Sequence, residues 1–250
     1  MNLKANNSLK LRIGVITTLY LVFSICIGIT TYAEEISPDR VVAERLITKI
    51  NFLLLIKEST KVSPDSKRVA YLAGLGNKGF AVVDGKEEKQ YDDIGKDSLI
   101  FSPDSKRVVY TAQADNKQFV VVDGKEGKQY DGIAEGTLIV SPDSKRVAYY
   151  AQIGNKWFFV VDGIEGKQYD GPTGTPIFSP DSKRVAYGAR IGNKRFLVVD
   201  GNEGKQYNSV VIPGGGRVVF ESTDSLYYLA LKMYYPKDGE IYLVEEKIVR

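Results

Sequence analysis

Two aspartates, Asp131 and Asp170, come nearest in this sequence to a catalytic arrangement. They occupy matching places in two copies of a repeat, 39 residues apart. Paired carboxylates across a cleft are the arrangement that hydrolyses glycosides, so an acidic site at the mouth of a funnel is one interpretation. Each aspartate is also followed by glycine. An Asp-Gly turn is the simpler explanation of the same residues.

A second group of candidates occupies one position of the repeat, just before a predicted turn. Gln113, Gln152 and Arg190 differ from copy to copy there, and Trp157 interrupts the column formed by Gly79, Gln118 and Arg195. Loops and turns on a rigid scaffold usually carry binding residues. We therefore expect Gln113, Gln152, Arg190, Asp131, Asp170 and Trp157 to form a binding face. The alternatives are drift in tolerant loops and, for Trp157, a cap on the edge of its repeat unit.

The residues that are missing exclude several kinds of chemistry. The sequence has no histidine and one cysteine, Cys26. Ser-His-Asp and Cys-His nucleophiles, histidine-ligated metals and disulfide frameworks are therefore excluded, and we predict no metal or cofactor. The net charge of +3 comes from Lys4, Lys10 and Arg12, because the residues after position 33 carry 31 positive and 31 negative charges. A neutral body without a basic tract predicts no nucleic-acid partner.

The first 33 residues have the parts of an export signal. Three cations precede an apolar run over residues 13–29, and Thr31-Tyr32-Ala33 forms a small-residue exit before Glu34. We predict cleavage after Ala33 and an exported protein, periplasmic or extracellular. The alternative is an uncleaved membrane anchor at residues 13–29, since this run is near the lower length for a span. Contact with a membrane is expected only in that case.

The rest of the chain consists of near-copies of one unit. SPDSKRVAY, or SPDSKRVVY in the second copy, begins at Ser63, Ser102, Ser141 and Ser179, and VVDG and KQY follow in step. A fixed period of 38 or 39 residues indicates a repeat architecture. The Lys-Arg pairs after each SPDS are balanced by the aspartates of the same motif and are expected to be solvated turns. The alternative is a basic ring that binds an anionic polymer.

Each unit is predicted to hold four short strands. An apolar strand runs into the SPDS turn, a second strand leads to a glycine or asparagine turn, and a third ends in an Asp-Gly hairpin before a short fourth strand. Four antiparallel strands in about 40 residues are the blade of a β-propeller. The predicted fold class is all-β, with five blades favoured and six as the alternative. Phe80, Phe119, Phe158 and Phe196 share one register and are expected in the core between blades.

The predicted domains are a signal peptide, residues 1–33, and one propeller, residues 34–250. The clear repeats span residues 61–99, 100–138, 139–176 and 177–207, and a degenerate blade starts at 208. Ser37-Pro38-Asp39-Arg40 is a shortened echo of the motif. We expect the leftover strands, residues 52–56 and 241–244, to pair and close the ring, because an open array leaves sheet edges exposed.

The element FSPDSKRVAY followed by FVVVDG resembles the WD-repeat-like propeller repeat of the TolB type, closely over residues 61–207. It departs from that repeat at Ser66, Ser105, Ser144 and Ser182, where the family favours glycine; a type I turn tolerates this change. The resemblance implies a propeller fold. The same repeat forms the propellers of prolyl-oligopeptidase-like and tricorn-type enzymes, which carry a separate catalytic domain.

From these features we predict an exported, non-catalytic propeller that binds a protein, a peptide or a cell-envelope component. The prediction that the protein is not an enzyme depends on the missing histidine and on the lack of length for a catalytic domain. The alternative function is a propeller hydrolase or lyase that uses acidic residues at the axial mouth. Convergence of polar side chains on one point would distinguish the two.

Overall fold

The structure, a computed structural model, describes residues 32–37, 40–210, 217–234 and 238–248. The chain forms two compact units, Met1–Lys49 and Ile50–Arg250. The predicted signal and anchor segments, apart from Tyr32 and Ala33, lie outside the described residues, and so does the Gly-rich part of the degenerate copy, residues 211–216. Among the described residues, no helix is long and apolar enough to span a membrane.

The described part of the first unit is a single antiparallel hairpin. Strand β1 (Tyr32–Ser37) pairs with β2 (Arg40–Glu44), with Tyr32 opposite Glu44 and Ser37 opposite Arg40. Ser37 and Arg40, the ends of the motif's echo, therefore lie in a hairpin of the first unit, whereas the predicted propeller domain began at residue 34. Pro38 and Asp39 lie outside the described residues. Cleavage after Ala33 would shorten β1 by its first two residues.

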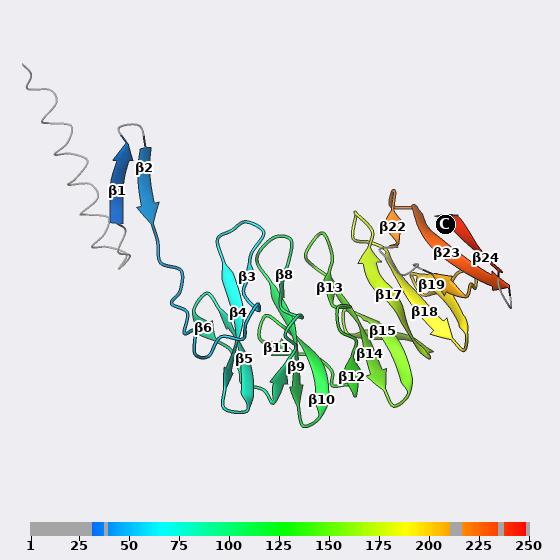
Figure 1. Ribbon diagram of the computed structural model, residues 1–250, viewed down its shortest axis with the longest axis horizontal. Helices are drawn as coiled ribbons and strands as arrows, with labels where there is room; N and C mark the ends of the chain where they lie inside the picture. The colour runs from blue at the N-terminus through cyan, green and yellow to red at the C-terminus, as the bar shows by residue number, and fades with distance from the viewer. Residues whose placement is uncertain (1–31, 38–39, 211–216, 235–237, 249–250) are drawn as a thin grey trace, which may run out of the picture. The chain divides into compact units, whose positions relative to one another are not determined.

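The second unit contains five antiparallel sheets in its described residues, which we call blades 1 to 5 in chain order (Figure 1). Blades 1 to 4 each have four strands, the first of which is split in two in blades 2 and 3; in blade 5 the first strand is likewise in two pieces, and only two strands follow it among the described residues. Blade 1 has β3 (Lys61–Val62), β4 (Val69–Leu75), β5 (Lys78–Val83) and β6 (Lys86–Glu87); blade 2 has β7 (Asp93–Ile94), β8 (Ile100–Phe101), β9 (Val108–Ala114), β10 (Lys117–Val122) and β11 (Lys125–Glu126); blade 3 has β12 (Gly132–Ile133), β13 (Ile139–Val140), β14 (Val147–Ile153), β15 (Lys156–Val161) and β16 (Ile164–Tyr169); blade 4 has β17 (Gly171–Phe178), β18 (Val185–Ile191), β19 (Lys194–Val199) and β20 (Asn202–Glu203); blade 5 has β21 (Ser209–Val210), β22 (Val219–Phe220), β23 (Ser225–Tyr234) and β24 (Asp238–Lys247). The prediction of an all-β chain built of four-stranded antiparallel blades is confirmed.

The hairpin between the third and fourth strands follows the predicted turn chemistry. In blade 2, Asp123 and Gly124 have φ values of 52° and 75°, which are the left-handed values that a two-residue hairpin requires. The Asp123 carboxylate also accepts a hydrogen bond from the backbone N–H of Val108, at 2.9 Å. The turn and the start of the second strand are thereby held together at one end of the blade.

The first strand is where the structure departs from the predicted repeat boundaries. Both β7 and β8 pair with β9, so the sheet of blade 2 begins at Asp93, before the predicted boundary at residue 100. Between the two pieces, residues 95–99 leave the sheet, and residues 134–138 do the same in blade 3. In blade 4 the corresponding strand, β17, runs through with only a shift of register between Thr173 and Ile177. The interrupted strands of blades 2 and 3 line the cavity described below.

The hydrophobic core lies between consecutive blades. Tyr110 and Phe119 of blade 2 pack with Leu72 of blade 1 in one buried cluster, and equivalent clusters join each later pair of blades. Between blades 3 and 4, the rings of Phe159 and Tyr187 stack with centroids 4.1 Å apart. The expectation that the aromatic register lies in this core is confirmed for Phe119, Phe158 and Phe196. Phe80 is also buried, but its cluster joins blade 1 to Ile50, Leu54 and Leu55 and not to another blade.

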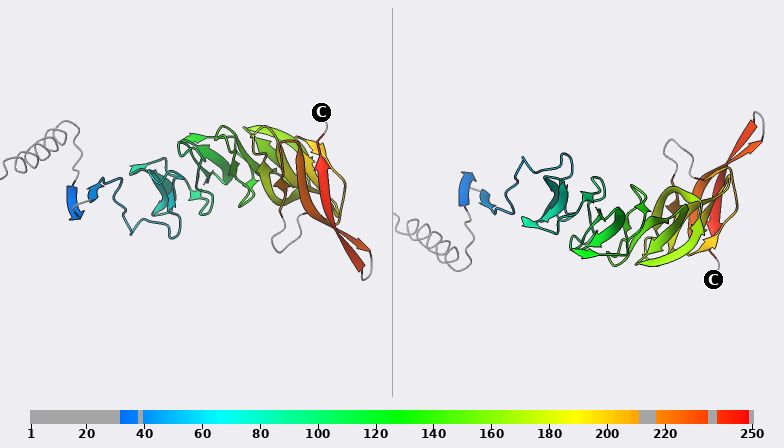
Figure 2. Two further views of the ribbon diagram at one scale, coloured as in Figure 1. Left: turned by 90° about the horizontal axis from the view of Figure 1, so that it is seen from above. Right: turned by 90° about the horizontal axis from the view of Figure 1, so that it is seen from below.

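The five blades form a row whose first and last members lie at opposite ends in two views (Figure 2). In the described residues, the core clusters join only neighbouring blades. The expected pairing of residues 52–56 with residues 241–244 is not formed. Leu55 makes an isolated bridge to Ala73 of blade 1, and residues 241–244 belong to β24, which pairs with β23 of blade 5.

Candidate binding site

The candidate residues of the varying column form cross-strand pairs at one register of each blade. Gln113 lies opposite Gln118, Gln152 opposite Trp157, and Arg190 opposite Arg195. Blade 1 carries Gly74 opposite Gly79 at the same place. The two repeat positions that differ between copies therefore face each other across two strands. They form one residue pair in each of blades 1 to 4, next to the turn between the second and third strands.

Most of these pairs meet the following blade, which gives their variation a packing reason. A Cβ on Gly79 would lie 2.7 Å from Ile94 Cγ2 of blade 2. The Gln118 side-chain oxygen accepts a hydrogen bond from the Ile133 N–H of blade 3 at 2.7 Å. Arg195 donates to the carbonyl oxygen of Asn208, which leads into blade 5. The pairs act as spacers between blades, each matched to its neighbour.

Trp157 is half-buried and packs against the cluster between blades 3 and 4. It lies within the sheet of blade 3, opposite Gln152 on one side and Tyr169 on the other. Gln152 donates to the carbonyl oxygen of Gly154 in its own turn, at 2.9 Å. Arg190 donates to the carbonyl oxygens of Gly192 and Asp170, at 3.3 and 2.8 Å.

Asp131 and Asp170 each accept hydrogen bonds from two neighbouring blades. Asp131 accepts hydrogen bonds from Lys117 Nζ of the preceding blade at 2.5 Å and from the Gly154 N–H of its own blade at 2.6 Å. Asp170 accepts the equivalent bonds from Lys156 Nζ at 2.6 Å and the Gly192 N–H at 2.7 Å. The Lys117 bond lowers the pKa of Asp131, and the Gly192 bond lowers the pKa of Asp170. A general acid needs a raised pKa, so this geometry does not support the proposed carboxylate pair.

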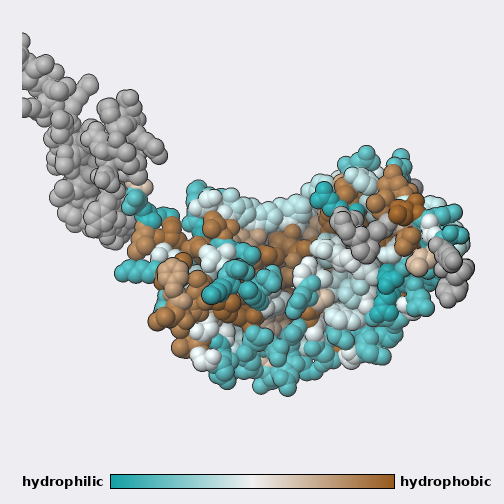
Figure 3. Space-filling model, viewed as in Figure 1, coloured by the Kyte–Doolittle hydropathy of each residue, from teal (hydrophilic) through white to brown (hydrophobic). Residues whose placement is uncertain are grey.

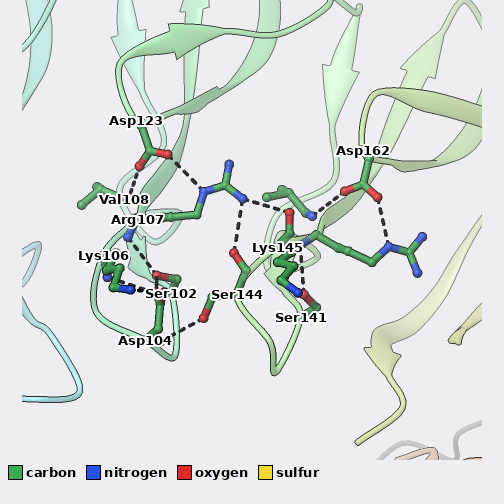
Figure 4. A network of polar contacts seen from close by, with 12 residues as sticks. Ser102, Asp104, Lys106, Arg107, Val108, Asp123, Ser141, Ser144, Lys145 and Asp162 are labelled. Atoms are coloured by element: carbon green, nitrogen blue, oxygen red, sulfur yellow. Dashed lines mark hydrogen bonds and ion pairs between the residues drawn. The ribbon is translucent and has the colours of Figure 1, made fainter. Parts of the chain in front are cut away.

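At the opposite end of the blades, the arginine of each Lys-Arg pair forms polar contacts with the next blade (Figure 4). Arg107 Nε pairs with Asp123 of its own blade at 3.1 Å, and its Nη1 donates to the carbonyl oxygens of Ser144 and Lys145 in the next blade. Arg68 and Arg146 repeat this pattern. The arginines are thus engaged in inter-blade contacts, and only the lysines extend into solvent.

The serines that end the SPDS turns have a left-handed backbone conformation. Ser105, at the fourth position of its turn, has a φ of 67°, and its three counterparts are similar. Its N–H donates to the Ser102 carbonyl oxygen at 2.9 Å, which is the bond that closes a four-residue turn. The Ser105 hydroxyl accepts a hydrogen bond from the Asp65 N–H of the preceding blade at 3.0 Å. Ser144 and Ser182 accept the same bond. At these three positions the serine side chain links two blades, which glycine could not do.

One cavity brings a predicted residue together with groups that the sequence did not indicate. It has a volume of about 330 Å³ and lies between the interrupted first strands of blades 2 and 3. Gln113 and Gln118 form part of its wall. Its charged side chains are Asp93, Lys96, Asp97 and Glu135, and its apolar wall includes Ile94, Ile100, Ile133 and Leu138. This volume is at the lower end of the range of small-ligand sites.

Of the six predicted site residues, only Gln113 lines this cavity; Gln152, Arg190, Asp131, Asp170 and Trp157 do not. The loops beginning at Asp92 and Asp131 differ in sequence between copies, and this variation pointed to them as candidate binding loops. The sequence does not show that the two loops line one cavity, because that depends on how the two blades stack. In the part of the chain that the structure describes, no group of three acidic, histidine or cysteine side chains could hold a metal ion.

Comparisons with known proteins agree with this architecture. No protein-family model and no curated protein matches the sequence. Among solved structures, TolB from Acinetobacter baumannii is 19% identical over 70% of this chain and 50% of its own, with a TM-score of 0.38. The β-propeller domain of the Trilobed protease from Pyrococcus furiosus is 12% identical over 89% of this chain and 80% of its own, with a TM-score of 0.42. The chain is thus similar to TolB and to a β-propeller domain, and its own antiparallel sheets are blades repeated along the chain.

The TolB-like propeller resembles parts of larger proteins as well. This chain spans half the length of the Acinetobacter TolB. It also matches the acylaminoacyl peptidase of Pyrococcus horikoshii, 14% identical over 78% of this chain and 39% of that one, with a TM-score of 0.41. The prediction that the protein is not an enzyme is corrected by this finding. One fold can carry many unrelated functions, so the architecture by itself is no ground for excluding catalysis.

Proposed function

We propose that this protein is an exported propeller that binds a peptide segment of a cell-envelope protein in the cavity between blades 2 and 3. The observation that carries the proposal is the lining of this cavity. Three carboxylates and one ammonium group surround an apolar wall. Such a lining suits a peptide in which a basic side chain stands beside an apolar one, because the two parts of the ligand meet matching surfaces.

Three features of the cavity support an extended ligand. Its charged groups belong to two loops of neighbouring blades, so a ligand across the junction touches both. Asp93, Asp97 and Glu135 are exposed, while Ile94 and Ile133 beneath them are buried. Gln113 is half-buried, and its only side-chain bond in the described residues is a long one of 3.5 Å from Gln118, so its amide is available for a peptide backbone.

The test is a peptide array probed with the full chain and with a variant that neutralises the cavity, Asp93→Asn/Asp97→Asn/Glu135→Gln. We expect the wild-type protein to select peptides with basic and apolar residues, with binding that weakens as salt is added. The variant should lose this selection. A matched control, Glu87→Gln/Glu221→Gln/Asp238→Asn, removes as many charges from exposed sites elsewhere and should retain it. Equal selection by all three proteins would contradict the proposal.

Export is the second part of the proposal and is tested separately. The basic residues, the apolar run and the small-residue exit before Glu34 support it. We expect a mature protein that begins at Glu34, as measured by mass spectrometry of the protein recovered outside the cytoplasm. Deletion of residues 13–29 should retain the chain inside the cell. An intact amino terminus on membrane-bound protein would favour the anchor instead.

A further inference from the structure

Blade 5 has an apolar face that no neighbouring blade covers in the described residues. On β23, Leu226, Tyr228 and Ala230 are buried against blade 4. The alternate residues on the other face are exposed or half-buried, and they lie opposite apolar partners on β24: Leu229 is opposite Leu243, and Leu231 is opposite Ile241. Ile241 is 65% exposed and Leu243 is 60% exposed. We call this surface the tail face; its exposed members are Tyr227, Leu229, Met233, Ile241 and Leu243.

The inner blades show what usually covers such a face. In blade 3, consecutive residues Ala148, Tyr149 and Tyr150 are all buried, because blades 2 and 4 cover both sides of the sheet. In blades 1 to 4, the face that points towards the next blade is covered by that blade. In blade 5 the equivalent face is apolar but exposed, and an exposed apolar surface of this kind is typical of an interface. Lys232, the cation within β23, does not interrupt this apolar face. Its Nζ lies 4.7 Å from the centre of the Tyr242 ring, and Tyr242 is on the other face of the sheet, opposite Ala230.

The other end of the row carries side chains that would fit such a face. Ile50, Leu54 and Leu55 pack on the buried cluster of blade 1. The turn between them is fixed by hydrogen bonds from the Leu54 N–H to the Asn51 carbonyl oxygen and from the Leu53 N–H to the Asn51 side chain. It displays Phe52 and Leu53, which are 78% and 95% exposed. We call the turn of residues 51–54 the head knob.

The match between the two ends is apolar. Of the charged residues on β24, only Glu245 and Lys247 share the face of Ile241 and Leu243, because Asp238, Glu240 and Glu246 lie opposite Tyr234, Lys232 and Leu226 on the other face. Figure 3 shows hydrophobic residues gathered over blade 1 and into the middle of the row, and a further group near blade 5.

We propose that the head knob of one copy of this chain docks on the tail face of a second copy. A second copy is the occupant that carries both matching surfaces, and the contact would repeat the blade-to-blade packing found within the chain. The head and tail of one row lie at opposite ends (Figures 1 and 2), so they meet between copies without rearrangement of the row. This head-to-tail contact is heterologous, so it closes a ring of copies or extends into a chain of them.

Disulfide trapping tests the contact directly. In a full chain with Cys26→Ser, one protein carries Leu53→Cys and another carries Leu243→Cys; both sites are exposed, so folding should not suffer. Mixing the two under mild oxidation should give a covalent heterodimer at least tenfold above a control mixture. The control pairs Leu53→Cys with Ile164→Cys, which lies on blade 3 and is 75% exposed. Equal yields in both mixtures would overturn the proposal.

A double variant separates this contact from closure within one chain. When Leu53→Cys and Leu243→Cys are on the same molecule, the proposal expects covalent oligomers, and a disulfide-bonded monomer would overturn it. Sedimentation equilibrium gives an independent measure. The wild-type protein should self-associate, Leu243→Lys should sediment as a monomer, and the matched Ile164→Lys should behave as wild type. A wild-type monomer across the whole concentration range would also overturn the proposal.

Discussion

The serine that ends each SPDS turn has two opposing effects on stability. Its left-handed backbone costs about 1 kcal/mol relative to glycine, because a Cβ is unfavourable there. Its hydroxyl links blades only where a preceding blade exists. Ser105, which is buried, accepts the Asp65 N–H. Ser66, in blade 1, is exposed and accepts no hydrogen bond in the described residues.

We therefore expect two chemically identical changes to differ in sign or size. Ser66→Gly removes backbone strain and should leave the free energy of unfolding unchanged or slightly higher. Ser105→Gly also removes an inter-blade hydrogen bond, so it should be less stable than Ser66→Gly by about 1 kcal/mol. Urea unfolding of both variants beside the wild type measures this difference. Equal stability of the two variants would show that the hydroxyl contributes nothing.

The carboxylates between blades predict how stability depends on pH. The pKa of Asp131 is lowered from its ordinary value of 3.8, chiefly by the bond from Lys117 and also by the Gly154 N–H. A lowered folded-state pKa stabilises the protein above the unfolded-state pKa, and this contribution is lost as the pH falls through the folded-state value. Stability should therefore fall in acid, below about pH 4.

Two substitutions test whether Asp131 takes part in this loss. Asp131→Asn cannot titrate, and Lys117→Gln should raise the pKa of Asp131 towards its ordinary value. Each should lower stability at neutral pH and flatten its decline between about pH 6 and about pH 3. The measurement is the free energy of unfolding in urea at several pH values. An acid decline as steep as that of the wild type, in both variants, would contradict the assignment.

At the scale of elements, the fit between neighbouring blades depends on the spacer pairs. Gly79 and Gly74 lie opposite each other in blade 1, yet a Cβ would meet very different surroundings. At Gly79 it would lie 2.7 Å from Ile94, whereas at Gly74 the nearest atom is the Lys78 carbonyl oxygen at 3.8 Å. Gly79→Ala should therefore destabilise the protein by about 1–3 kcal/mol through overpacking. Gly74→Ala, an ordinary contact, is the matched control and should change stability far less.

A second change identifies the cause. Ile94→Ala shortens the side chain that the new methyl group would strike, so the double variant Gly79→Ala/Ile94→Ala should lose less stability than the sum of the single variants. Thermal unfolding monitored by circular dichroism measures all four proteins. Additive losses would mean that Gly79 is required for a reason other than the approach of Ile94.

The elements also show what sequence could and could not predict. The strands, the Asp-Gly hairpins and the aromatic register follow local rules, and all were predictable from one repeat. The partner of residues 241–244 was not, because an apolar strand fits several sheet edges equally well and the choice is made by the whole fold. Gln118 stood in the varying column, but its place beside Gln113 in the cavity depends on the loops of two blades.

For the whole molecule, the row of blades predicts unfolding from its ends. When each unit contacts only its neighbours, stability is a sum of unit and interface terms, and a weakened end unit can open alone. Phe80 of blade 1 and Phe159 of blade 3 are 1% and 2% exposed. Truncation to alanine should cost about 3–5 kcal/mol at either site. The two losses should nevertheless be distributed differently along the row.

Trp157, the single tryptophan, reports on the contact between blades 3 and 4. In Phe80→Ala, circular dichroism should show an early loss of strand signal in urea while the fluorescence of Trp157 stays unchanged. In Phe159→Ala, the fluorescence should change at the start of unfolding, because the weakened cluster includes Trp157. Protein dilute enough to separate copies keeps the head-to-tail contact out of the measurement. If both variants instead showed one coincident transition, the blades would be coupled throughout, as in a closed ring, and the row would not be open in solution.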